Sequence, residues 1–302
     1  MVHYNNCPFC RSEEIRHYLQ TSDHFLTKEP FEIYECTGCG TLFTQNHPEE
    51  GNSTRYYAVD DYISHDDNAP GFVNSIYRIS RKIMLRNKKT LVQRLTALKA
   101  GRLLDIGSGT GHFISAMKNA GWSVKGVEVN DKARDYSISR FGVDVISQEQ
   151  ISALPTSDFD CITLWHVLEH LHEPFKYVSE IQRLLKPEGI CVAALPNCDS
   201  YDAHHYREFW AAWDVPRHLW HFNPASFRSF AESKGFTVIR MARMPLDVFY
   251  ISVLSEKYKK SGFYLINGII KGPFFACRAL FNLSASSSLI YILKKKDQQQ
   301  GF

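Results

Sequence analysis

The 302-residue sequence predicts an α/β protein with a mostly parallel sheet, preceded by a small N-terminal module. Three observations predict it. Short apolar runs alternate with helical patterns over residues 102–194, as in a parallel sheet. A glycine-rich turn follows the first run, and four cysteines form two close pairs near the N-terminus. A net charge of +3 is too small to indicate a nucleic-acid or anionic-membrane partner.

The two cysteine pairs predict a structural zinc ribbon. Cys7 and Cys10 stand in CPFC, and Cys36 and Cys39 stand in CTGCG. Two CxxC pairs can direct four thiolates at one ion, and Gly40 permits the tight turn after the second pair. The alternatives are a redox motif or core thiols, but a redox motif needs only one pair.

We divide the chain into three parts. Residues 1–45 form the ribbon, residues 46–100 a connector and a helical cover, and residues 101–302 the α/β domain. The helical cover is expected over 72–98, where apolar residues recur at helical spacing. The N-terminus has no charged region followed by an apolar stretch, so we expect no secretory signal and a cytoplasmic protein.

The segment GRLLDIGSGTGHFISAMKNAGWSVKGVEVND carries the clearest chemical signal. It predicts a strand at 102–106, a helix at 110–120 and a second strand that ends at Glu128. Glu128 stands where a carboxylate can accept both hydroxyls of a ribose. Asp105 precedes the glycines, where an acid would repel a phosphate. A carboxylate there suits a cationic ligand such as S-adenosylmethionine.

The chain resembles the class I S-adenosylmethionine-dependent methyltransferases in LLDIGSGTG, FDCITLWHVLEHL, LLKPEGICVAALPN and GFTVIRM. The resemblance runs from about residue 80 to the end of the chain. It implies a Rossmann-like, doubly wound, mostly parallel seven-stranded sheet whose last strand, at 287–296, is antiparallel. The ribbon together with WHVLEH and DVPRHLWHF is similar to a group of bacterial methyltransferases of unassigned substrate, related to the ubiquinone-biosynthesis type.

The resemblance also implies the residues of the cofactor site. Asp105 and the glycine turn would surround the methionine portion. Glu128 would hold the ribose, and Gln148 or Glu149 would lie near the adenine. Trp165 is equally well interpreted as a core aromatic. The residues assigned to the cofactor are Asp105, Gly107, Ser108, Gly109, Gly111, Glu128, Gln148, Glu149, Trp165 and His166.

Residues 210–224, WAAWDVPRHLWHFNP, belong to a segment predicted as a long loop over the carboxyl edge of the sheet. Its tryptophans, Trp210, Trp213 and Trp220, are expected to build a substrate pocket.

Two histidines in this loop, His218 and His221, are candidate general bases because neutral imidazole can take a proton from a hydroxyl near pH 7. Each could instead be a structural residue bonded to the backbone. His166 and His170 compete for the role of base.

Residues 246–284 form an insertion that the sheet does not need. Lys271 and Arg278 interrupt it, so no uncharged run approaches the roughly 20 residues of a membrane span. It could cover the active site, pair with a second subunit, lie on a membrane surface or form a buried helical pair.

We expect an S-adenosylmethionine-dependent methyltransferase that acts on a small-molecule, lipid-linked or glycan-linked acceptor, at oxygen or carbon. One alternative is an RNA methyltransferase that uses the ribbon, and another is a non-catalytic regulatory protein that binds the cofactor. LWHV stands where amino-group methyltransferases of nucleic-acid bases carry Asn/Asp-Pro-Pro-aromatic, which disfavours adenine or cytosine methylation. With the ribbon as a separate module, zinc removal is expected to leave cofactor binding largely intact.

Overall fold

The computed structural model describes residues 1–57 and 72–296. Residues 58–71, part of the predicted connector and cover segment at 46–100, and residues 297–302 lie outside the described residues. Two sheets are present in the described part, one of four strands at the N-terminal end and one of seven strands. The predicted fold class, a mostly parallel seven-stranded sheet with an antiparallel last strand, is confirmed.

The seven-stranded sheet has the order β10-β11-β8-β7-β4-β5-β6. Five strands, β4 to β8, run parallel, and β11 is antiparallel to both of its neighbours. The carboxyl ends of the parallel strands therefore meet at one edge, where ligands bind in such sheets. The strands are β4 (Arg102–Ile106), β5 (Ser123–Val127), β6 (Asp144–Ile146), β7 (Phe159–Trp165), β8 (Leu185–Pro196), β10 (Phe236–Arg243) and β11 (Ser288–Lys295).

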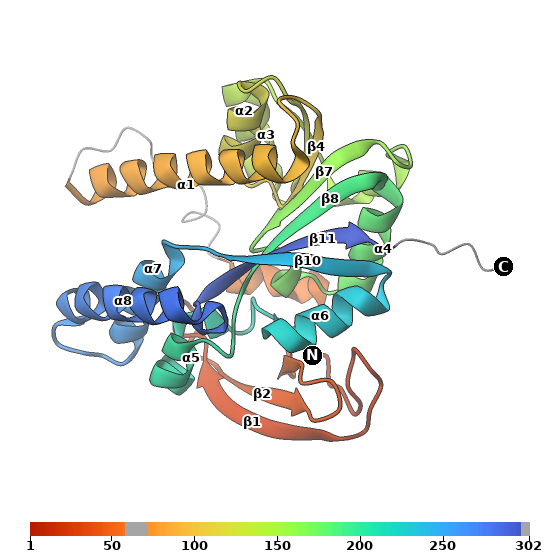
Figure 1. Ribbon diagram of the computed structural model, residues 1–302. Coiled ribbons are helices and arrows are strands. Elements are labelled where there is room, and N and C mark those ends of the chain that lie inside the picture. Colours follow the sequence, from red (N-terminus) through yellow and green to blue (C-terminus); the bar gives the residue numbers. More distant parts are fainter. Residues whose placement is uncertain (58–71, 297–302) are drawn as a thin grey trace.

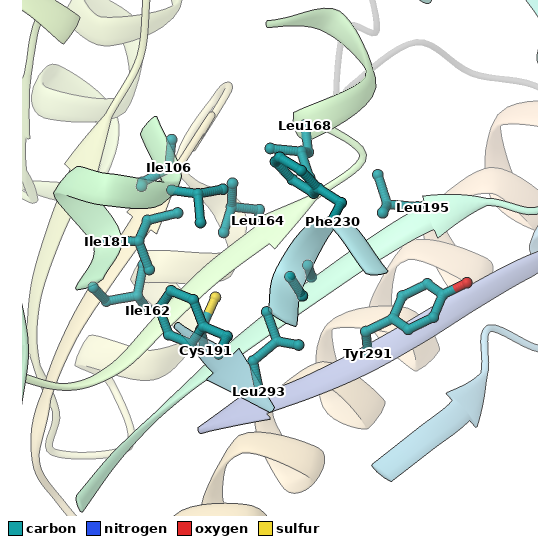
Figure 2. Packing of buried hydrophobic residues seen from close by; sticks show 14 of the residues in the cluster. Ile106, Ile162, Leu164, Leu168, Ile181, Cys191, Leu195, Phe230, Tyr291 and Leu293 are labelled. Atoms are coloured by element: carbon teal, nitrogen blue, oxygen red, sulfur yellow. The ribbon is translucent and has the colours of Figure 1, made fainter. Parts of the chain in front are cut away.

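Helices cover both faces of this sheet. On one face, α4 (Pro174–Leu184) and α6 (Pro224–Ser233) bury Ile181 and Phe230 against Leu164 of β7 (Figure 2). On the other face lie α1 (Phe72–Thr96) and α2 (His112–Lys118), with α3 (Asp131–Phe141) between β5 and β6. The helical cover was predicted at 72–98, and α1 ends two residues earlier, at Thr96.

The N-terminal sheet joins the ribbon to the rest of the chain. Its order is β1 (Ile15–Ser22), β2 (Pro30–Cys36), β3 (Leu42–Gln45) and β9 (Trp220–His221). β9 comes from the segment predicted as a loop, and its Trp220 pairs with Phe43 of β3. The ribbon therefore lies directly against the α/β domain (Figure 1).

The ribbon–domain junction is also packed with aromatic rings. The ring of Phe9 lies with its centroid 5.1 to 5.5 Å from the rings of Phe175, Trp220, Phe222 and Phe230. Residues from both parts bury these rings in one continuous hydrophobic cluster. Burial of this apolar surface couples the stability of the two parts.

The insertion between β10 and β11 forms two helices, α7 (Asp247–Tyr258) and α8 (Tyr264–Phe281), which pack against each other (Figure 1). The helices approach closely at two glycines. A Cβ at Gly268 would stand 2.5 Å from Val253 Cα, and one at Gly272 would stand 2.8 Å from Phe249 Cδ1. None of the described helices combines the length and the apolar character needed to cross a membrane. The short α5 (Tyr201–Tyr206) lies beside this pair.

Candidate active site

The glycine turn follows β4 at the carboxyl edge of the sheet. Gly107, Gly109 and Gly111 have φ values of 71°, 54° and 77°, in the left-handed region that favours glycine. A Cβ at Gly107 would lie 2.4 Å from Val167 Cγ2, and one at Gly111 would lie 2.5 Å from Ser137 Cβ. The turn therefore needs glycine for both conformation and space.

Glu128 follows β5 directly and is buried beside this turn. Its Oε2 accepts a hydrogen bond from the Gly109 backbone N–H at 2.7 Å, and its Oε1 accepts one from Asn130 at 3.0 Å. An ionised carboxylate has about four lone-pair positions. The fixed carboxylate thus has acceptor capacity left for the two hydroxyls of a ribose.

Asp105 is buried at the carboxyl end of β4, where its Oδ1 accepts a hydrogen bond from the Thr163 hydroxyl at 2.5 Å. Burial raises the pKa of Asp105 to about 7, although the Thr163 bond and the positive charge of Lys88 oppose the rise. Lys88 reaches the site from α1 and lies 4.4 Å from the ring centroid of Trp165. Near neutral pH this carboxyl group can therefore change its charge.

Two polar atoms near this turn lack partners. Ser108 Oγ and Trp165 Nε1 are buried and make no hydrogen bond within the described part of the chain. Unsatisfied buried donors are rare and often mark a site for a ligand. Together with the carboxylates of Asp105 and Glu128, they fit a ligand that has hydroxyls and a cationic end, as S-adenosylmethionine does.

The two residues predicted near the adenine begin the 3₁₀ helix η2 (Gln148–Ala153), after β6. Gln148 Oε1 accepts a hydrogen bond from the Tyr177 hydroxyl at 2.7 Å, and Glu149 is exposed. Their contact with a nucleobase stays a prediction.

His166, at the end of β7, is held between two carboxylates. Nε2 donates to Asp247 Oδ2 at 2.8 Å and Nδ1 donates to Glu169 Oε1 at 3.2 Å. Burial alone would lower the pKa of His166, but the charges of Asp247 and Glu169 raise it to about 10. A doubly protonated ring has no lone pair to accept a proton, so the geometry argues against the predicted base role of His166.

The three loop tryptophans are buried, with their indole nitrogens bonded inside the protein. Each Nε1 donates a hydrogen bond of 2.7 to 2.8 Å. Trp210 donates to Asp202 Oδ2, Trp213 to the Arg207 carbonyl and Trp220 to the Leu171 carbonyl. These contacts explain the tryptophans as packing residues at the junction with the ribbon. The predicted substrate pocket gains no support from them.

His221 faces the ribbon. The Thr44 hydroxyl donates to the His218 carbonyl at 2.7 Å, so its oxygen accepts the Nε2–H of His221 at 3.0 Å. Burial lowers the pKa of His221 well below its ordinary value, which keeps the ring neutral. The structural alternative to a base is therefore the better interpretation of His221.

His218 lies in a second group, with Glu169 and His170 of the 3₁₀ helix η3 (Leu168–His170). One oxygen of Glu169 and one nitrogen of each ring lie within 4.8 Å of one another. The sequence suggested both histidines as bases but missed Glu169 and the grouping. The acid–histidine pair that stands a few residues after the parallel strand β7 was the available signal.

The four predicted zinc ligands converge in the ribbon. The Sγ atoms of Cys7, Cys10, Cys36 and Cys39 all lie within 4.8 Å of one another, and none of these cysteines forms a disulfide. The Cys7–Cys39 and Cys10–Cys36 separations are 3.6 and 3.4 Å, near the roughly 3.8 Å expected between sulfurs of a tetrahedral zinc site. Gly40, with a φ of 69°, makes the turn after the second pair. These four thiols could hold a metal ion.

A family model described as "Methyltransferase domain" matches residues 78–241, more than half of the chain. The chain is 30% identical to a ubiquinone biosynthesis O-methyltransferase of Thiobacillus denitrificans over 30% of this chain and 43% of the relative. It is 25% identical to a probable S-adenosylmethionine-dependent methyltransferase of Mycolicibacterium smegmatis, over 62% of this chain and 70% of the relative. The matched region covers less than half the length of the curated O-methyltransferases that the chain matches first.

Solved structures share the fold. A magnesium protoporphyrin IX methyltransferase from Synechocystis, with S-adenosylhomocysteine bound, aligns with a TM-score of 0.51 at 12% identity. The alignment covers 82% of this chain and 95% of that one. A didemethyltoxoflavin N1-methyltransferase from Burkholderia thailandensis aligns with a TM-score of 0.50 at 15% identity, over 85% of this chain and 96% of that one.

Proposed function

The chain belongs to the methyltransferase domain family, and we propose that it transfers the methyl group of S-adenosylmethionine to an oxygen of a lipid-linked acceptor. The observation that carries the cofactor assignment is the meeting of Glu128, Asp105 and the glycine turn at one edge of the sheet. The printed names of the O-methyltransferase relatives support transfer to oxygen.

In this proposal each group at the edge has one task. Glu128 accepts the ribose hydroxyls, and the Asp105 carboxylate faces the cationic methionine end. The unpaired Trp165 and Ser108 donors gain partners when the ligand binds. A sulfonium methyl group is reactive toward in-line displacement, so the protein chiefly aligns the acceptor and excludes water.

The exposed face of α8 supports a lipid-linked acceptor. Its outward side chains recur at helical spacing and form an apolar stripe, whereas the opposite face packs on α7. Phe281 is 92% exposed and Ile270 is 65% exposed. The large exposed apolar side chains of this helix are Leu265, Ile266, Ile269, Ile270, Phe274, Leu280 and Phe281.

Positive charges flank this stripe. Lys257, Lys259 and Lys260 are exposed where α7 ends and the chain turns toward α8. An apolar helix face beside exposed lysines is typical of a helix that lies on an anionic membrane surface. α7 begins at Asp247, the partner of His166 at the carboxyl end of β7. A membrane-bound acceptor would therefore arrive close to the proposed methyl donor.

We expect the protein to bind vesicles that contain phosphatidylglycerol more tightly than vesicles of phosphatidylcholine alone. Replacing Ile266 and Ile270 together by Ser should weaken vesicle binding about tenfold or more, because partial burial of two isoleucines contributes at least about 1.4 kcal/mol. Ile239→Ser changes an isoleucine of β10 that is 50% exposed and should bind like the wild type. Cosedimentation measures all three proteins, and equal binding of all three would contradict the membrane assignment.

The acceptor class is tested directly with methyl-labelled S-adenosylmethionine and separated lipid, metabolite and RNA fractions of bacterial cells. The proposal expects label in the lipid fraction. Label confined to RNA would instead support the alternative in which the ribbon binds RNA.

We further propose that Cys7, Cys10, Cys36 and Cys39 bind one structural zinc ion. Four thiolates form a closed tetrahedral site with no position for a substrate, so the ion would stabilise the ribbon and take no part in methyl transfer. The Sγ separations support this role.

A further inference from the structure

We propose that Glu169, His170 and His218 form a second metal site, which binds a divalent transition-metal ion beside the glycine turn. The site is distinct from the cysteine cluster, because its ligands come from η3 and from the segment before β9. A carboxylate and two imidazoles are a common donor set for zinc and for iron in proteins.

Hydrogen bonds indicate which ring nitrogens are free to bind a metal ion. His170 Nδ1 lies 3.1 Å from the Arg217 carbonyl, and His218 Nδ1 lies 2.8 Å from the Ala212 carbonyl. A carbonyl only accepts, so both Nδ1 atoms carry the proton and donate it. Each neutral ring then keeps its lone pair on Nε2. Metal-binding histidines are typically oriented in this way by a carbonyl on the other nitrogen.

Glu169 provides the anionic ligand. Its side chain is 1% exposed, and its Oε2 has no hydrogen-bond partner among the described residues. Its Oε1 accepts the hydrogen bond of His166, and its backbone carbonyl accepts one from Leu219 N–H at 2.8 Å. The second bond ties η3 to the segment that carries His218. The carboxylate is therefore held in place with one oxygen left to coordinate.

The cluster is costly without a cation. One nitrogen of each imidazole and one oxygen of Glu169 lie within 4.8 Å of one another in a largely buried region, with the two ring centroids 4.5 Å apart. Buried acceptors that face one another lose their hydration and gain no donor. The carboxylate of Asp214, 3.9 Å from His218 Nε2, is already paired with Arg217. A divalent ion would satisfy all three acceptors at once.

The place of the site suggests what the ion would do, and this step rests on the proposed function. η3 follows Val167, whose side chain is in contact range of Gly107 in the turn. Three protein ligands leave coordination positions open, as in catalytic metal sites. An acceptor hydroxyl bound there would be oriented toward the methyl donor, and its pKa would fall.

Cobalt(II) is the probe for this site. Protein purified with its ribbon zinc in place is titrated with Co²⁺, and the absorption of the bound ion is followed without S-adenosylmethionine or acceptor. We expect one equivalent to bind without the thiolate-to-cobalt bands of a cysteine site. Glu169→Gln should weaken Co²⁺ binding by more than tenfold, and His166→Gln, which removes the support of Glu169, by about 10- to 100-fold.

An exposed histidine of α5, His204, provides the matched control, since His204→Gln should bind Co²⁺ like the wild type. If Glu169→Gln fails to fold, His170→Asn carries the same test, because His170 is the least buried of the three residues. Failure of the wild type to bind Co²⁺, or equal affinity in the ligand variants and the control, would overturn the proposal. S-adenosylmethionine affinity, measured separately, distinguishes this failure from failure of the proposed function.

Discussion

Removal of the proposed zinc ion from the cysteine cluster should destabilise the α/β domain as well as the ribbon. Structural zinc in small modules typically contributes about 10–16 kcal/mol of apparent binding free energy to folding. Here β3 of the ribbon pairs with β9, and Phe9 packs among rings of the domain. Loss of the ribbon would expose those rings and leave β9 without its partner strand.

Cys36→Ser tests this expectation. We expect the variant to lose bound zinc and to melt at a lower temperature than the wild type, with a change in the fluorescence of the junction tryptophans. Cys277→Ser changes an exposed cysteine of α8 and should preserve both properties. Full zinc content in Cys36→Ser, or an unchanged melting curve after zinc loss, would contradict the account. The sequence led us to expect a separate ribbon that unfolds alone when zinc is removed. Because β3 and β9 share one sheet, we now expect the α/β domain to lose stability as well.

The second large effect is expected at Arg217. Its guanidinium is buried and donates to Asp23 at 2.9 Å, to Asp214 at 2.6 Å and to the Tyr56 carbonyl at 2.9 Å. It thereby connects the loop before β9 to the ribbon and to the connector. Burial alone would raise the pKa of Asp23, but Arg217 and backbone N–H groups lower it to about 2, so this carboxylate is charged at neutral pH.

Arg217→Met should lower the free energy of unfolding by about 3–5 kcal/mol, because it leaves the buried Asp23 charge without its cationic partner. Urea denaturation at pH 7 measures the loss. Arg140→Met, at an exposed position of α3, should change the unfolding free energy by less than about 0.5 kcal/mol. A loss as small in Arg217→Met as in this control would show that the ion pairs do not stabilise the fold.

Features encoded by local pattern were well predicted from the sequence. The strand predicted at 102–106 is β4, and the second strand ends one residue before Glu128. Apolar runs, glycines and a terminal acid specify these elements without distant partners. The antiparallel last strand followed from the family resemblance and is β11.

The loop of tryptophans and histidines could not be placed in this way. Its position depends on the pairing of Phe43 with Trp220, which are far apart in the sequence. The composition of this loop suggests a pocket, but its side chains contact the ribbon instead, as His221 contacts Thr44. The proximity of Glu169 and His218 depends on another long-range contact, the hydrogen bond that the Leu219 N–H donates to the Glu169 carbonyl.

Calorimetric titration with S-adenosylmethionine tests most directly whether Glu128 and Asp105 bind this ligand. Glu128→Ala should weaken binding by roughly 10- to 150-fold, the range of about 1.5–3 kcal/mol for hydrogen bonds to a charged group. Glu188→Ala, at an exposed acid of β8, should bind like the wild type.

The same titration has an expected pH dependence. The pKa of Asp105 in the free protein is about 7, and only its ionised form attracts the cationic ligand. Below pH 7 binding must expel a proton, so wild-type affinity should rise about tenfold from pH 6 to pH 8 and level off above that. Asp105→Asn should bind more weakly at pH 8 and lose this dependence. Weaker binding in Glu128→Ala together with a pH-dependent wild type is the result that the account predicts, whereas equal affinity of Glu128→Ala and the wild type at every pH would contradict it.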